Sequence, residues 1–171
     1  MYRGDFADFL RFATGGTEAL TINPSQQVGI GFDAPTEKLD VNGNIRASAD
    51  FISGASTLVV PDYVFERYFM GNSKLKTTYN FKSLEEIETF VKKHHHLPGI
   101  KSATEVKKEG SWNLSESNLQ NLEKIEELYL HTIEQEKKID QLQSEKEVLF
   151  EEVKALRNDL NEIKTMLKKY E

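Results

Sequence analysis

Cysteine is absent from all 171 residues of this sequence. Disulfide bonds, thiolate metal sites and cysteine nucleophiles are therefore excluded. No stretch approaches the ~20 apolar residues that are needed to cross a bilayer. Residues 1–12 contain Arg3, Asp5 and Arg11 where a signal peptide has an apolar run. We expect no membrane span and no visible export signal, with packing as the source of stability.

An excess of positive charge is also lacking, because 22 Lys and Arg residues face 28 Asp and Glu residues. The basic residues are spread among the acidic ones, so no basic stripe is available to neutralise a nucleic-acid backbone. Nucleic acid is thus not expected as a partner. The shares of hydrophobic residues (38%) and charged residues (29%) are normal for a chain with a long solvated helix. This balance favours a head with a stalk.

Catalytic and cofactor patterns are missing as well. Gly29 and Gly31 lack the third glycine and the strand-to-helix context of a phosphate-binding loop. Serine, histidine and aspartate occur without the arrangement of a catalytic triad. Solvated helix faces and caps explain the acidic residues that could be paired on paper, namely Asp62, Glu66, Glu85, Glu86 and Glu88. We expect no enzyme activity, no catalytic residues and no cofactor.

The run His94-His95-His96 is the metal candidate, because imidazoles are common ligands of transition metals. Adjacent histidines on a helix point about 100° apart, so one chain presents one or two of them to an ion. Three chains around an axis could each supply His94 and His96. The simpler interpretation is a polar helix end, where histidine caps carbonyls and suits the helix dipole. We expect no bound metal.

Two further patterns keep a cell-surface receptor or a glycan open as a partner. Arg3-Gly4-Asp5 resembles the short adhesive tripeptide that integrins bind, although three residues match often by chance. An aromatic cluster could be a binding platform, but such a cluster is more often the core of a small domain. Its members are Tyr63, Phe65, Tyr68, Phe69, Tyr79 and Phe81.

Residues 1–60 predict a β-rich segment of short strands between turn signals. The dipeptide Asn42-Gly43 predicts a type I′ turn. Strands this short bury too little surface to stand alone, whereas three chains wound together could share one core. Because the sequence opens inside a strand pattern, we expect it to be the end of a longer polypeptide. The strand residues are Phe9, Leu10 and Phe12, Leu20 and Ile22, Val28 and Ile30, Leu39 and Val41, and Ile45, with Gly15-Gly16, Asn23-Pro24 and Asp33-Ala34-Pro35 as further turns.

Residues 61–118 predict a small α+β head. Ser83-Leu-Glu-Glu86 is a capping box that starts a helix through Val91. Ser102-Ala-Thr-Glu105 starts a second, short helix that ends at Gly110. Between them, Leu97-Pro98-Gly99-Ile100 predicts a turn, because proline cannot continue a helix.

Residues 119–171 predict a coiled coil, because apolar residues recur with a heptad spacing and no Gly or Pro interrupts them. The helix would extend roughly 70 Å. Parallel dimers and trimers both remain open, since Ile and Val at a with Leu at d also suit two strands. Position a holds Ile125, Thr132, Ile139, Lys146, Val153, Leu160 and Leu167, and position d holds Leu128, Gln135, Leu142, Leu149, Leu156, Ile163 and Tyr170.

The polar members of this heptad pattern, Thr132, Gln135 and Lys146, lower stability while disfavouring slipped registers. We interpret them as residues that set the register. At the start of the helix the apolar face is wider than a two-position stripe, which predicts that the head packs against this end. The widening residues are Leu119, Leu122, Tyr129, Leu130 and Ile133.

Long phrases of the chain resemble tail-fibre-like and surface proteins from Bacteroidetes and their phages. Val28-Gly-Ile-Gly31 and Pro35-Thr-Glu-Lys-Leu-Asp-Val-Asn-Gly-Asn-Ile-Arg-Ala47 are similar to their recurring unit, VGIGT-x-x-P-x-x-KLDVNGNIRA. Further matching phrases are Pro61-Asp-Tyr-Val-Phe65, Ser83-Leu-Glu-Glu-Ile-Glu88, His96-Leu-Pro-Gly-Ile100, Ser102-Ala-Thr-Glu-Val106, Asn113-Leu-Ser-Glu116 and Leu122-Glu-Lys-Ile-Glu-Glu-Leu128. The resemblance implies a homotrimeric fibre end at a cell surface, outside the cell or on a virion.

The layout also resembles, more distantly, the intramolecular-chaperone endopeptidase domains of phage tailspikes. Those domains trimerise a β-rich fibre through helices and often cut themselves off with a Ser-Asp motif. Here the corresponding place is Val60-Pro61-Asp62, without a serine nucleophile. The resemblance therefore implies the trimerising role. The missing serine argues against self-cleavage.

Taken together, the patterns predict an α+β protein with intertwined β repeats in residues 1–60, a small head in 61–118 and a parallel coiled coil in 119–171. We expect a non-catalytic structural module that trimerises and nucleates folding of a fibre, with a trimer favoured over a dimer. The alternatives are a fibre tip for adhesion, which binds a receptor, glycan or metal, and an autoproteolytic intramolecular chaperone.

Overall fold

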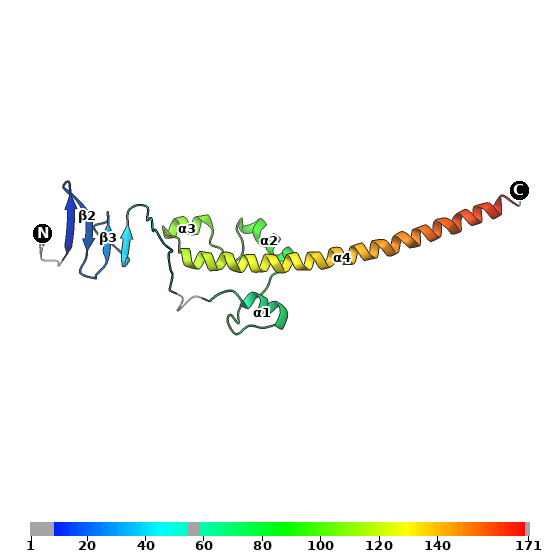
Figure 1. The fold of residues 1–171 in the computed structure, drawn as a ribbon, viewed down its shortest axis with the longest axis horizontal. Coiled ribbons are helices and arrows are strands. Elements are labelled where there is room, and N and C mark those ends of the chain that lie inside the picture. Colours follow the sequence, from blue (N-terminus) through cyan, green and yellow to red (C-terminus); the bar gives the residue numbers. More distant parts are fainter. Residues whose placement is uncertain (1–8, 55–58, 170–171) are drawn as a thin grey trace. The chain divides into compact units, whose positions relative to one another are not determined.

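The computed structural model describes residues 9–54 and 59–169 (Figure 1). Along the chain, two compact units are divided between Ile52 and Ser53. The head and the long helix therefore belong to one unit, and the β-rich unit ends before the expected boundary at residue 60. Two features from the sequence, Arg3-Gly4-Asp5 and Tyr170, lie outside the described residues.

The first unit is a four-stranded sheet whose strands follow the order of the chain. Strand β1 (Leu10–Thr14) pairs antiparallel with β2 (Thr17–Ile22), β2 pairs antiparallel with β3 (Val28–Ile30), and β3 pairs parallel with β4 (Leu39–Val41). The first four predicted strands are confirmed. All of this pairing occurs within one chain.

The hairpin between β1 and β2 turns through Gly15 and Gly16, whose φ angles are +60° and +80°. Two positive φ angles in succession are what a type I′ turn requires, and glycine supplies them without steric cost. The same turn was predicted at Asn42-Gly43, and this prediction is wrong. Gly43 does not have a positive φ angle, and Ile45 lies outside any strand. The reason is that β4 pairs parallel with β3, so the Asn42 amide donates to the Ile30 carbonyl and the chain leaves the sheet without reversing.

The two faces of this sheet differ sharply. One face is covered by the connection between β3 and β4, residues 31–38, under which Thr21 and Gly29 are buried, and Pro35 is the buried residue of the connection itself. A Cβ atom at position 29 would collide with the Phe32 carbonyl, so only glycine allows the connection to lie this close. On the other face, all the paired strand residues are apolar except Thr14 and Thr17 at the hairpin end.

The second unit contains four helices, α1 (Tyr63–Met70), α2 (Leu84–His94), α3 (Ala103–Glu109) and α4 (Leu114–Leu167). Both predicted capping boxes are confirmed, because Ser83 and Ser102 each accept from the backbone amide three residues on. Helix α2 continues beyond Val91 to His94, and α3 ends at Gly110 as predicted. The predicted turn at Leu97–Ile100 is also present.

Helix α4 begins earlier than the predicted start at Leu119. The Asn113 side chain accepts from the Glu116 amide at 3.1 Å and so caps the helix. The 54 residues of α4 make it about 80 Å long at 1.5 Å per residue. No helix in the described part of the chain combines the length and apolarity that would let it span a membrane.

The head was predicted to be α+β, and this is wrong for its described residues 59–118, which contain helices and loops but no strand. The aromatic residues between α1 and α2 pack against helices instead of pairing as a strand. Tyr63, Val64, Tyr79 and Leu130 form the buried apolar core, with Tyr68 and Phe81 packed against it. All described β-strands of this α+β protein therefore lie in the first unit.

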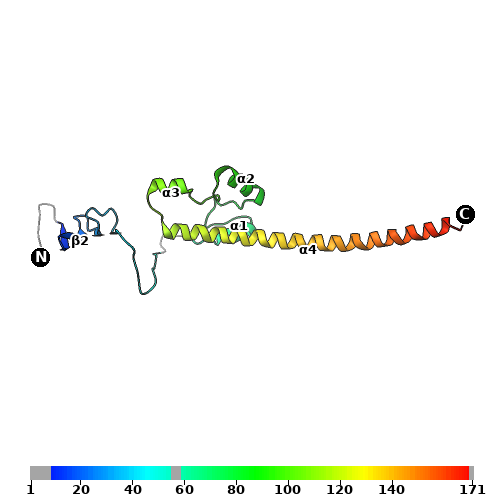
Figure 2. The same ribbon diagram turned by 90° about the horizontal axis from the view of Figure 1, so that it is seen from above.

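Helices α1 to α3 lie beside the N-terminal half of α4, with α1 on a different side from α2 and α3 (Figures 1 and 2). From Thr132 onwards every described residue of α4 is exposed. The second half of this helix thus extends beyond the other elements of its unit.

Candidate oligomerisation site

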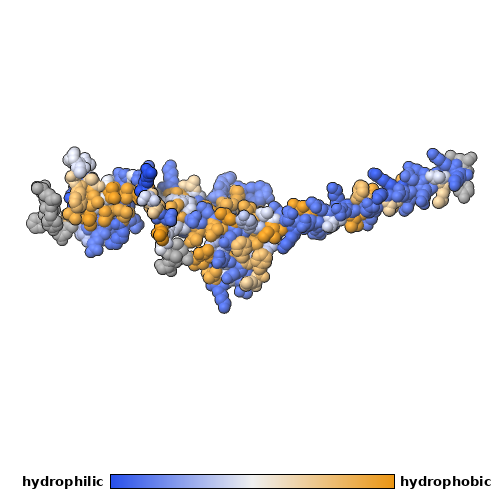
Figure 3. Space-filling view, in the orientation of Figure 1, coloured by the Kyte–Doolittle hydropathy of each residue, from blue (hydrophilic) through white to orange (hydrophobic). Residues whose placement is uncertain are grey.

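The candidate site is the heptad stripe on α4, which we call the seam. All its predicted members up to Leu167 lie on α4 and are exposed. The apolar members expose between 46% and 66% of their surface, and Figure 3 shows apolar side chains recurring along the helix. The seam comprises Ile125, Leu128, Thr132, Gln135, Ile139, Leu142, Lys146, Leu149, Val153, Leu156, Leu160, Ile163 and Leu167.

The head packs against α4 on the side away from the seam. Successive residues turn about 100° around a helix, so Leu130 and His131 point about 140° and 240° from Ile125. Both are buried, at 0% and 4% exposure, whereas Ile125 and Leu128 expose 49% and 63% within the same turns. The head therefore occupies the back of α4 and leaves the seam accessible along its whole length.

The centre of this head contact is the buried Glu123 carboxylate. It accepts hydrogen bonds from the Tyr63 hydroxyl and from the ammonium groups of Lys76 (2.8 Å) and Lys124 (2.8 Å). Burial alone would raise the pKa of Glu123, but the hydrogen bonds from Lys124, Lys76 and Tyr63 outweigh it and lower the pKa to about 2. The charged carboxylate thus ties α1 and the following loop to α4.

A second carboxylate extends the contact one turn further along α4. Glu127 accepts from the Tyr79 hydroxyl at 3.0 Å and from Lys124 at 2.9 Å. Burial raises the pKa of Tyr79, and the charge of Glu127 raises it further, so this hydroxyl stays protonated and donates. The Tyr79 ring packs against the Tyr63 ring at 5.0 Å, and Lys76 lies 4.6 Å from the centre of that ring.

One buried carboxylate lacks such partners. Glu126 is 8% exposed, and its Oε2 atom has no hydrogen-bond partner among the described residues. Burial raises its pKa, and the nearby charges of Asp62 and Glu123 raise it further. Glu126 is therefore the unfavourable member of the head contact.

The end of the head contact is formed by His131. Its ring stacks on Phe81 at 4.6 Å, and its Nδ1 atom lies 3.6 Å from the Glu134 carboxylate. Glu134 also accepts from the Tyr68 hydroxyl at 2.8 Å. After this residue, α4 leaves the head.

The sequence predicted the head contact but assigned most of its residues wrongly. Of the five residues that widen the apolar face, only Leu130 is fully buried, and Tyr129 exposes 63% of its surface. At other positions of α4 that face the head, the buried residues are the carboxylates Glu123 and Glu127. They are buried there because tyrosine and lysine side chains donate to them. The missed residues Glu123, Glu127 and Glu134 do carry a signal, since together with Leu130 they recur at intervals of three or four and so share one helical face.

The histidine run lies where α2 ends. The His94 ring stacks on Phe90 at 4.4 Å, and the His96 ring meets Phe90 edge-on at 5.4 Å. His95 has a φ of +61° and its amide donates to the Val91 carbonyl, which ends the helix. In the part of the chain that the structure describes, no three or more His, Asp or Glu side chains gather as metal ligands.

The aromatic cluster divides into core and surface. Tyr63 and Tyr79 are buried, and Tyr68 and Phe81 pack against them. Phe65 and Phe69 expose 37% and 64% of their surface. The cluster is thus mainly the core of the head, with two members on the outer side of α1.

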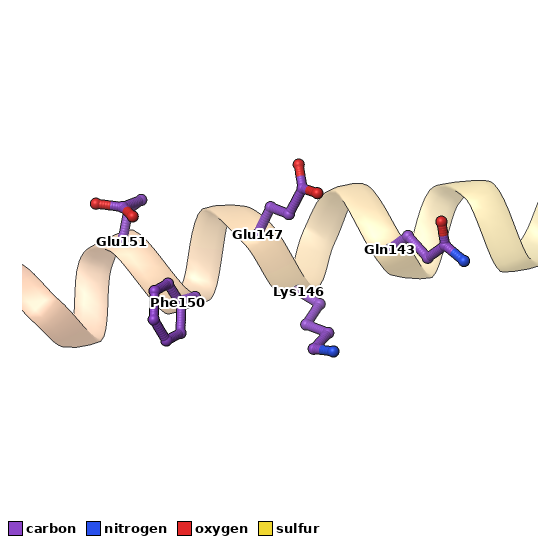
Figure 4. A pocket seen from close by; sticks show the side chains of 5 residues that line it. All are labelled: Gln143, Lys146, Glu147, Phe150 and Glu151. Carbon is purple, nitrogen blue, oxygen red and sulfur yellow. The ribbon is translucent and has the colours of Figure 1, made fainter.

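A shallow hollow of about 500 Å³ lies on the free half of α4. Figure 4 shows that all the lining side chains come from this one helix, with Lys146 and Phe150 pointing to one side and Glu147 and Glu151 to the other. Gln143 is the remaining lining residue. Because a single helix supplies every lining side chain, the hollow is an open surface and not an enclosed pocket.

Comparisons of the chain with protein-family models, with curated proteins and with solved structures find no match.

Proposed function

We propose that the chain is a non-catalytic trimerisation module, the C-terminal end of a fibre-like surface or phage-tail protein. The observation that carries this proposal is the seam, which is apolar, regular and exposed along α4 on the side opposite the head. No other described element reaches the helix beyond Glu134, so one chain leaves the seam uncovered.

The energetics favour association. Full burial of a large apolar side chain contributes ~1.5–3 kcal/mol, and the apolar seam residues are about half exposed. Their burial in a coiled coil would thus contribute about 10 kcal/mol per chain before the entropy of association is subtracted. This gain is enough to assemble copies at low concentration.

The partners are copies of the same chain in parallel. The polar residues Thr132, Gln135 and Lys146 meet their own counterparts only when identical helices lie parallel and unshifted, so any other register buries them against apolar side chains. Leu160 at a followed by Ile163 at d favours more than two strands, whereas Ile139 followed by Leu142 suits two. The resemblance to fibre proteins supports three.

The mechanism is physical. Heptad contacts are local in sequence, so the α4 helices associate early, while the long-range pairing of short strands is slow. Association of the helices then holds the upstream segments of the three chains together. The module would in this way nucleate the folding of the fibre to which it belongs.

The test compares two adjacent residues of similar exposure, Leu149 in the seam (58%) and Val148 beside it (60%). In light scattering, the unchanged chain and Val148→Asp should both have the mass of a trimer. Leu149→Asp places three carboxylates against one another in the seam, so it should shift the mass to that of a monomer at micromolar concentration. A monomeric unchanged chain, or equal effects of the two substitutions, would refute the proposal.

A second candidate is an adhesive fibre tip, favoured by the aromatic residues on the outer side of α1. Phe69 and Met70 expose 64% and 74% of their surface, and exposed apolar groups of this kind often mark binding surfaces. A glycan array probed with the unchanged chain and with Phe69→Ser tests it. Binding that depends on Phe69 would support adhesion, and silence of both proteins would count against it.

A further inference from the structure

The open face of the sheet is apolar at every paired position except Thr14 and Thr17, which lie at the hairpin end of β1 and β2. The register places Leu10 and Phe12 beside Ile22 and Leu20, and continues the same face across β3 and β4. None of these side chains is buried, and Phe12, Ile30 and Leu39 expose 52%, 43% and 54% of their surface. The full set, which we call the sheet face, is Leu10, Phe12, Leu20, Ile22, Val28, Ile30, Leu39 and Val41.

The described residues of the first unit offer nothing to cover the sheet face. The connection in residues 31–38 is already used on the opposite side, above Thr21 and Gly29. The residues after β4 do not fold over it either, since Ile45 and Phe51 expose 59% and 72% of their surface. Within its described residues, the first unit therefore closes one side of its sheet and leaves the apolar side open (Figure 3).

The size and chemistry of the sheet face suit a copy of itself. Three of the eight apolar side chains are about half exposed and the other five are partly exposed, so together they present on the order of 400 Å², within the range of the largest apolar patch of a typical monomer. The face carries no charge, and its hydrogen-bonding side chains are confined to Thr14 and Thr17 at the hairpin end, so it has little with which to select a different partner. An apolar surface of this kind is complementary to itself, as interfaces between identical subunits require.

We propose that the sheet faces of three copies pack together into one apolar core, a second interface separate from the seam. This inference rests on the proposed trimerisation by α4, which keeps the three sheets at high effective concentration and so makes a modest patch sufficient. Because every strand already pairs within its own chain, the copies meet through side chains and exchange no strands. The β segments are thus joined side to side, with no intertwining of strands.

The experiment uses the full chain and a charge on either side of the sheet. Ile30→Lys places an ammonium group on the sheet face, and Ala34→Lys places one on the exposed connection that covers the other side. Both are made in the unchanged chain and in the Leu149→Asp chain. Solution mass and amide-exchange protection of β2 and β3 are measured for all of them.

In the trimer, Ile30→Lys should lower protection of β2 and β3 at least tenfold while the mass stays that of a trimer. Ala34→Lys should change neither quantity. In the Leu149→Asp monomer, protection should already be low, and Ile30→Lys should add little to the loss. A larger loss of protection from Ile30→Lys in the trimer than in the monomer distinguishes packing between copies from damage within one sheet.

Two results would overturn the inference while leaving the proposed function intact. One is an equal loss of protection from Ile30→Lys in trimer and monomer, which would mean that the residue acts only within its own chain. The other is equal protection of the unsubstituted trimer and monomer, which would mean that the sheet face stays open to a different partner. A monomeric unchanged chain would overturn both proposals, and its mass alone would show this.

Discussion

The carboxylates of Glu123 and Glu126 lie one turn apart on α4, are buried to the same degree and behave in opposite ways. Three donors surround Glu123, so its charge is favoured in the folded state. The Oε2 atom of Glu126 has no donor among the described residues, and the charges of Asp62 and Glu123 lie nearby. At the scale of single residues, the surroundings of a carboxylate decide whether it stabilises the head, and its burial alone does not.

This contrast predicts that Glu123→Gln and Glu126→Gln change stability in opposite directions. Glu123→Gln leaves Lys76 without its charged partner and Lys124 with Glu127 alone, and it should lower the free energy of unfolding of the head by about 1–3 kcal/mol. Glu126→Gln removes an unpaired charge and should raise it by up to ~1 kcal/mol. The measurement is urea unfolding followed by the fluorescence of the single tryptophan, Trp112, in the Leu149→Asp chain. A loss of stability in both variants would contradict the prediction.

The same residue predicts how the head responds to acid. The pKa of Glu123 is lowered from 4.5 to about 2 in the folded state, so its contribution is fully present above the unfolded pKa near 4.5. That contribution disappears as the pH falls from about 4.5 to about 2. The unfolding midpoint in urea should therefore fall across this range, and Glu123→Gln should flatten the fall. A profile that Glu123→Gln leaves unchanged would show that other groups control acid unfolding.

One side of helix α4 packs against the head and the other carries the seam. The polar residues of the seam should lower the stability of the assembly while raising the specificity of its register. Lys146→Leu should raise the thermal midpoint, because a leucine adds buried apolar surface at position a. It should also broaden the mass distribution, because it removes a residue that opposes slipped or alternative assemblies. Native mass spectrometry beside thermal unfolding, both at one protein concentration, checks the two outcomes. A single trimer with a lower midpoint would be the opposite of the expectation.

The sequence predicted the elements whose causes are local. The capping boxes at Ser83 and Ser102 and the glycine at position 110 act within a few residues, and the structure contains all three helix ends. The pattern at Asn42-Gly43 was misleading because β4 pairs with β3, which lies across a connection of eight residues, and that pairing determines the direction of the chain. The polar head contact escaped prediction for the same reason, since Lys76 and Glu123 are 47 residues apart.

At the scale of the whole molecule, the head contact on α4 ends near Glu134, and this point decides which truncations keep the head folded. A deletion from Ile125 onwards would also remove Leu130 and Glu127 and so would destroy the head itself. A chain that ends after Glu136 keeps the head contact and loses most of the seam. We predict that it is a monomer in light scattering whose Trp112 fluorescence still reports a cooperative unfolding transition. A trimer of this shortened chain would show that the head or the sheet suffices for assembly.

The opposite placement of head and seam on α4 has a consequence for insertions and deletions. The angle around the helix axis between the head contact and the seam, which we call the phase, is set by the number of residues between His131 and each seam position. Adding seven residues to the free half advances the coiled coil by one full repeat and restores that phase, whereas adding one turns the seam by about 100°. Length variants of this chain should therefore be tolerated in steps that nearly keep this phase, such as seven or eleven residues, because a step such as one residue would point the heads in a new direction around the bundle.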